Sequence, residues 1–99
     1  MKYLIKNADD YIGGFVIVAG KVDRVDVTDY SKEDLSIMSD RAIEVLKDVI
    51  SYDVYLDGAD RPLTDNTDNP NVDTGKEYYF YVSVNKIIDH TFNIIDVFN

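Results

Sequence analysis

The only side chain of this sequence that titrates near neutral pH is the single histidine, His90, which follows Asp89. General acid–base catalysis would need this imidazole to be held beside a second titratable group. The sequence contains no Gly-x-Ser-x-Gly nucleophile pattern and no glycine-rich loop with a lysine that could hold phosphate. We therefore interpret His90 as a turn residue, and we expect a protein that is not an enzyme and has no cofactor.

The loop from residue 65 to residue 73 has oxygen-bearing side chains at alternate positions, which is the ligand type that hard cations prefer. These side chains are Asp65, Thr67, Asn69, Asn71 and Asp73. The EF-hand pattern also requires a glycine and a glutamate where this sequence has Pro70 and Lys76. Asp, Asn, Thr and Pro also form turns without an ion. We predict a surface loop without a metal; hydrolysis by clustered Asp with a divalent metal stays the enzymatic alternative.

Acidic side chains dominate the composition: 19 acidic residues face 10 basic ones in 99 residues, the net charge is −9, and 16 of the 19 acids are Asp. Residues 1–28 sum to zero, residues 29–60 to −6 and residues 61–99 to −3. Contact with a nucleic-acid backbone needs clustered Lys and Arg, so we expect no direct binding to nucleic acid. The negative field lies instead on the predicted helix, the strand after it and the loop.

Three of these acids, Asp40, Glu44 and Asp48, recur at four-residue spacing within the predicted helix. At about 1.5 Å rise per residue they form a row with neighbours about 6 Å apart. Such a row is most often a solvated helix face. The functional interpretation is that the carboxylates imitate a phosphate track and occupy the basic groove of a nucleic-acid-binding protein.

Tyrosines beside acidic residues are a second indication of a protein-binding surface. A tyrosine gives contact area at low entropic cost, and carboxylates form ion pairs with arginines of a partner. Tyr55 lies between Asp53 and Asp57, and Tyr79 and Tyr81 point to one face of a predicted strand. Burial in a core covered on both sides is the alternative for these tyrosines. The predicted partner-binding residues are Asp40, Glu44, Asp48, Asp53, Tyr55, Asp57, Asp65, Asp68, Asp73, Tyr79 and Tyr81.

The elements that must position these side chains begin with three predicted strands. Residues 1–7 alternate with a period of two, residues 15–19 form an apolar, β-branched run, and residues 22–27 alternate again. Gly20 and Lys21 are expected to turn the chain between the second and third strands.

A helix is predicted from Ser31 to Ile50, because apolar residues recur there at steps of three and four. The stripe consists of Leu35, Met38, Ala42, Val45, Leu46, Val49 and Ile50. Ser39 and Asp40 provide an alternative N-cap that would divide this helix in two. We expect the helix to cover one face of the sheet.

Strand patterns return at residues 52–56, followed by a turn at Asp57-Gly58 and a polar loop over residues 59–76 with a short strand near residues 62–64. Residues 77–85 and 91–98 read as a closing hairpin. The predicted fold is therefore α+β, an antiparallel sheet of five or six strands with one amphipathic helix packed on one face, in a single acidic domain over residues 1–99.

The sequence contains no cysteine, which excludes disulfides and thiolate chemistry. No apolar run reaches the length of about 18 residues that a membrane span needs, and no signal-peptide pattern opens the chain. We expect a cytoplasmic protein, in the host cytoplasm if a phage encodes it.

In size, acidity and lack of catalytic motifs the chain resembles the small acidic inhibitors of phages and mobile elements, including anti-CRISPR and anti-restriction DNA mimics. The resemblance implies a non-enzymatic inhibitor that binds the basic groove of a nuclease or effector complex. An immunity protein or antitoxin against a basic nuclease toxin is the alternative. A structural or accessory module, in which apolar strands and the tyrosine face form a homo-oligomer such as a homodimer, is the third hypothesis.

Overall fold

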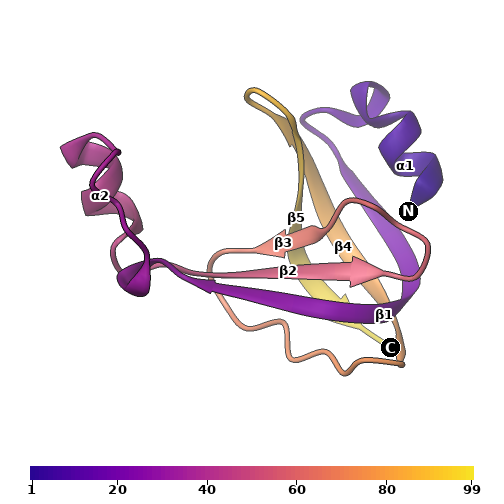
Figure 1. Cartoon of the computed structure of the whole chain (residues 1–99). Helices are drawn as coiled ribbons and strands as arrows, with labels where there is room; N and C mark the ends of the chain where they lie inside the picture. The colour runs from indigo at the N-terminus through magenta and orange to yellow at the C-terminus, as the bar shows by residue number, and fades with distance from the viewer.

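Five strands close into a β-barrel with the order β1-β2-β3-β5-β4 in the computed structural model, which describes residues 1–99 (Figure 1). The elements in chain order are α1 (Lys2–Lys6), η1 (Ala8–Tyr11), β1 (Phe15–Asp29), η2 (Tyr30–Lys32), α2 (Asp40–Leu46), β2 (Ile50–Leu56), β3 (Leu63–Asp65), β4 (Glu77–Lys86) and β5 (His90–Phe98). Neighbouring strands are antiparallel except β3 and β5, which are parallel.

The predicted turn at Gly20-Lys21 is wrong, because β1 runs through both residues as one strand. Its first part pairs with β4 up to Lys21, and its second part pairs with β2 from Val22 onward. A Cβ atom at Gly20 would lie 2.8 Å from Leu56 Cδ1. The glycine is therefore needed for close packing against β2 as the barrel closes, and not for a reversal of the chain.

The core is filled by alternate side chains from the strands, with two more from the N-terminal segment. Its members are Leu4, Ala8, Val18, Val22, Val54, Leu56, Leu63, Phe80, Val82, Val84, Phe92 and Ile94. The predicted strand over residues 1–7 is wrong: this segment contains α1, and Leu4 and Ala8 both reach the core. Their four-residue separation fits a helical face, and the period-two alternation of the exposed neighbours concealed it.

The predicted helix over residues 31–50 is wrong, and with it the α+β sheet covered by a helix. Only α2, seven residues long, forms, and Ser39 caps it by accepting a hydrogen bond from the Ala42 amide (3.2 Å). The alternative N-cap at Ser39 is thus the one the chain uses. Figure 1 shows α2 standing away from the barrel at the end of the β1–β2 ribbon. Closure encloses the core side chains of the strands within the barrel, so the core does not need a helix to cover it.

The remaining predictions for the second half are confirmed. β2 covers the predicted strand, Gly58 has the left-handed φ of 77° that a turn after Asp57 requires, and β3 forms beside it. β4 and β5 form the predicted hairpin. The β3–β5 and β1–β4 pairings, which complete the barrel, join segments distant in the sequence and have no local signal.

A closed five-stranded barrel with this strand order has the general architecture of the OB-fold. The connection between β1 and β2 covers residues 30–49, and the connection between β4 and β5 covers residues 87–89. None of the helices has the length and apolar character needed to cross a membrane.

Candidate protein-binding surface

Acidic side chains lie on the outer face of the β1–β2 ribbon, which we call the acidic ribbon (residues 22–29 and 50–56). Asp26 and Asp53 are direct cross-strand neighbours, and Arg24 faces Tyr55 in the adjacent pair. Two carboxylates side by side repel each other. The ribbon relieves this locally: Arg24 Nε lies 3.3 Å from Asp26 Oδ2, and Thr64 Oγ1 donates to Asp53 Oδ1 at 2.7 Å.

Arg24 also lies over the aromatic ring of Tyr55, with 3.9 Å between its Cζ atom and the ring centroid. This cation–π contact fixes the Arg24 guanidinium beside the Tyr55 ring. The pKa of Arg24 is raised, chiefly by the hydrogen bond to Asp26 and to a smaller degree by its charge interaction with that carboxylate. The one cation of the ribbon is therefore already engaged with its neighbours.

The ribbon continues into a projection formed by residues 30–49, which we call the arm. Tyr30 donates its amide hydrogen to the Val49 carbonyl (3.0 Å), so the arm begins and ends at one point. Asp40 and Glu44 lie on α2 and Asp48 lies just after it, all exposed. Glu44 pairs with Lys47 at 3.1 Å. The predicted row of three carboxylates is therefore a helical pair followed by one residue in a turn.

Apolar side chains of the arm are exposed as well, since the helix does not pack on a sheet. Ile37 is 93% exposed and Val45 is 65% exposed. A shallow depression of about 390 Å³ lies along α2 beside Ala42, Val45 and Leu46. The apolar stripe that the sequence assigned to the core is instead an unpartnered surface.

The loop carboxylates of the predicted site have different environments. Asp57, Asp68 and Asp73 are exposed, and Asp73 Oδ2 lies 3.3 Å from Lys76 Nζ. Asp65 is 8% exposed, and its Oδ1 accepts hydrogen bonds of 3.0 Å from the Thr67 amide, the Thr67 hydroxyl and the Asp68 amide. Its carboxylate therefore orders the turn after β3. No group of three or more His, Cys, Asp or Glu side chains is placed to hold a metal ion.

Tyr79 and Tyr81 lie on a different outer surface, away from the acidic ribbon. Their neighbours across the strands are Ala19 and Ile17 on β1. Tyr81 stacks on Phe15 and Tyr79 stacks on Phe98, with ring centroids 5.3 and 5.8 Å apart. The structure thus brings the ribbon residues Asp53 and Tyr55 together but separates these two tyrosines from them.

This aromatic surface is not among the sequence-based predictions, because the apolar run from Phe15 to Ala19 is typical of a central strand whose side chains are buried. The available signal was the alternation itself: Phe15, Ile17 and Ala19 point outward while Val18 is buried. Of the two alternatives for Tyr79 and Tyr81, exposure on a surface and burial in the core, the structure has exposure: their exposed fractions are 49% and 36%.

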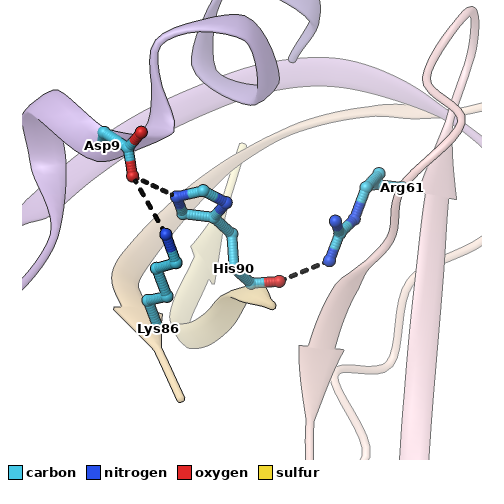
Figure 2. Close-up of polar contacts among 4 residues, drawn as sticks. All are labelled: Asp9, Arg61, Lys86 and His90. Carbon is cyan, nitrogen blue, oxygen red and sulfur yellow. Dashed lines mark hydrogen bonds and ion pairs between the residues drawn. The ribbon is translucent and has the colours of Figure 1, made fainter. Parts of the chain in front are cut away.

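His90 has a partner far away in the sequence, as Figure 2 shows. Its Nε2 lies 2.8 Å from Asp9 Oδ1, and Lys86 Nζ lies 3.7 Å from the same oxygen. The hydrogen bond to His90, followed by the charge of Lys86, lowers the pKa of Asp9 below its ordinary value of 3.8. Arg61 donates to the His90 carbonyl oxygen. The cluster ties η1 to the β4–β5 hairpin, and no surface cavity is lined by His90 or Asp9.

The fold and these surfaces define the chain as a small acidic β-barrel with a projecting arm. Comparison with protein-family models, with curated proteins and with solved structures finds no match. The function therefore has to be inferred from the residues themselves.

Proposed function

We propose that the protein is a non-enzymatic binding module whose arm and acidic ribbon occupy a basic, nucleic-acid-binding surface of another protein and thereby inhibit it. The observation that carries this proposal is the arm itself. It projects from the barrel with carboxylates and large apolar side chains exposed together, and α2 makes no extensive contact with any strand.

The charge of this region supports a basic partner. Residues 22–56 contain nine acidic and four basic side chains, a sum of −5 within a chain of −9. Opposite potentials accelerate encounter and fix orientation. The four cations are Arg24, Lys32, Arg41 and Lys47, and three of them lie within 4 Å of an acidic side chain of the same region.

The exposed apolar side chains support a protein partner. Solubility alone would account for the acids but gives no reason to expose Ile37 and Val45 on the same arm. An apolar centre with a charged rim is the usual arrangement of a protein–protein interface. In such an interface the aliphatic side chains provide affinity and the carboxylates provide the selection of a basic surface.

The OB-type architecture of the barrel also points to this surface. Barrels of the OB type bind oligonucleotides through the β2–β3 face and the β1–β2 loop. Here that loop is the arm, and the β2 face carries Asp53 beside Asp26. In a nucleic-acid-binding barrel this surface is basic, whereas in this chain it is acidic. An acidic surface favours a basic, nucleic-acid-binding protein as the partner and disfavours nucleic acid itself.

The experiment that tests this proposal captures basic proteins on the immobilised chain and releases them by competition with duplex DNA or RNA. A nucleic-acid-binding protein that is captured, and that salt and nucleic acid both release, supports the proposal. The triple variant Asp40→Lys, Glu44→Lys and Asp48→Lys should bind this protein at least about tenfold more weakly. The matched control is Asp10→Lys, Asp60→Lys and Asp89→Lys, which changes the net charge equally at exposed positions elsewhere. Equal weakening in both variants would reduce the effect to bulk charge and contradict the proposed surface.

A further inference from the structure

A second exposed surface remains after the arm and the ribbon are accounted for, and it is apolar. It is formed on the outside of β1, β4 and β5 and we call it the aromatic face; its residues are Phe15, Ile17, Ala19, Tyr79, Tyr81 and Phe98. The ring pairs Phe15–Tyr81 and Tyr79–Phe98 are nearly parallel, with interplanar angles of 22° and 18°. Stacking across strands holds these side chains in a fixed outer layer.

The aromatic face gathers several exposed, large apolar side chains on one side of the barrel. Phe15 is 58% exposed and Ile17 is 62% exposed, and Tyr79, Tyr81 and Phe98 are between 36% and 49% exposed. At about 150–250 Å² for a whole aromatic side chain, the face presents on the order of 500 Å² of largely apolar surface. A stable interface buries about 800 Å² on each partner, so this face with a polar rim has the required size.

Its charge differs from that of the rest of the chain. The strand segments that form it, residues 15–21, 77–83 and 96–98, contain three charged residues, Lys21, Glu77 and Asp96, which sum to −1. Lys21 and Glu77 are direct cross-strand neighbours. The remaining −8 of the chain therefore lies elsewhere.

We propose that the aromatic face is the interface between two copies of this chain. Two copies that meet at this face bring together almost no like charge, whereas contact through the acidic ribbon or the arm would place carboxylates against carboxylates. With a net charge of −1 in its strand segments, this face has little electrostatic attraction for a basic partner. Each strand of the closed barrel has a neighbouring strand on both sides, which favours association through side chains on an outer face.

The apolar surface also extends beyond the strands. Tyr3 on α1 is 69% exposed, and a depression of about 210 Å³ between α1 and β1 is lined only by apolar and aromatic residues, including Tyr3, Tyr11 and Ile17. In a two-fold dimer a side chain from one copy can enter this depression in the other, which is the reciprocal contact that an isologous interface requires.

Sedimentation velocity over about 1 to 500 μM protein measures this association directly. The wild-type protein should change from a species of 11.3 kDa to one of twice that mass. Added salt should leave the dimer unchanged or strengthen it, because it screens the repulsion between two chains of −9. A monomer at every concentration contradicts the proposal.

Two isoleucine substitutions locate the interface. Ile17→Lys places a cation in the centre of the face and should weaken dimerisation by at least about tenfold. Ile87→Lys makes the same change at the 91% exposed tip of the β4–β5 hairpin and should dimerise as the wild type does. Both variants lower the net negative charge equally, so a difference between them is not an effect of bulk charge. Dimerisation by Ile17→Lys at wild-type strength, or its equal loss in Ile87→Lys, contradicts the proposed face.

A third measurement uses the wild-type chain and so does not depend on the folding of a variant. Dilution across the dimerisation range should shift the amide NMR signals of residues 15–19 and 79–81 and leave those of residues 40–46 in place. Shifts confined to the arm would overturn the assignment. This inference is independent of the proposed function, since the two surfaces share no residue.

Discussion

His90 Nε2 lies 2.8 Å from Asp9 Oδ1, although 81 residues separate them in the sequence. The contact joins the N-terminal segment that closes one end of the barrel to the start of β5. Because Leu4 and Ala8 of that segment belong to the core, the hydrogen bond between Asp9 and His90 holds the segment at a second point on the surface.

Replacing Asp9 by Asn should destabilise the fold at pH values above the ordinary Asp pKa of 3.8. The pKa of Asp9 is lowered in the folded chain, so the stability from its charged form is present above the unfolded pKa and is lost as the pH falls through the folded pKa. Urea unfolding at about pH 6 and about pH 3 measures the difference. The difference in stability between Asp9→Asn and the wild type should be smaller at the lower pH than at the higher. Asp10→Asn, whose side chain makes no ion pair, should show no such dependence.

Replacing Gly20 by Ala should cost about 1–3 kcal/mol of folding free energy, because the new methyl group would lie 2.8 Å from Leu56 Cδ1. Denaturant unfolding of Gly20→Ala, Leu56→Val and the double variant tests the cause. The double variant should be more stable than the sum of the single effects predicts. Strict additivity would show that Leu56 is not the source of the strain.

Replacing Asp65 by Ala should cost about 1–3 kcal/mol, because a largely buried carboxylate oxygen accepts three hydrogen bonds. Hydrogen exchange should accelerate at the Thr67 and Asp68 amides, which would lose their acceptor. Asp68→Ala is the matched control, since the Asp68 side chain is exposed and accepts no bond. An equal loss of stability in the control would contradict the role given to Asp65.

Replacing residues 31–48 by Asn-Gly should leave the barrel folded, with its stability changed by no more than about 1 kcal/mol. Tyr30 and Val49 are already hydrogen-bonded across the base of the arm, so a two-residue turn can join them. Thermal unfolding followed by circular dichroism measures the outcome. Collapse of the barrel would mean that the arm contributes to the core.

How far the sequence predicts this fold depends on whether a pattern is local. The strands at residues 50–56, 77–86 and 90–98 are correctly indicated by alternation, because each strand buries one face. The predicted helix over residues 31–50 is wrong because its packing depends on non-local structure. Its apolar period is real, but the period alone cannot tell whether a surface exists to receive it, and barrel closure removes that surface.

In the candidate site, too, local features are predictable from the sequence and features that depend on distant residues are not. The sequence predicts Asp40, Glu44 and Asp48 on one long helix; Asp40 and Glu44 do lie on a helix, but α2 is short and Asp48 lies after its end. The burial of Asp65 and the separation of Tyr79 from Tyr55 depend on the turn chemistry and on the strand order of the barrel, which connect residues distant in sequence. The aromatic face depends on the same order, since β1 becomes a neighbour of the β4–β5 hairpin only through the long-range pairing of β1 with β4.

The affinity of the arm-replaced barrel for a captured nucleic-acid-binding protein tests the central claim most directly. The proposal predicts that replacing residues 31–48 by Asn-Gly weakens this binding by at least about a hundredfold in calorimetry, while the barrel stays folded and dimeric. It also predicts that the wild-type chain competes with nucleic acid for that protein. Wild-type affinity in the folded, arm-replaced barrel would contradict the claim.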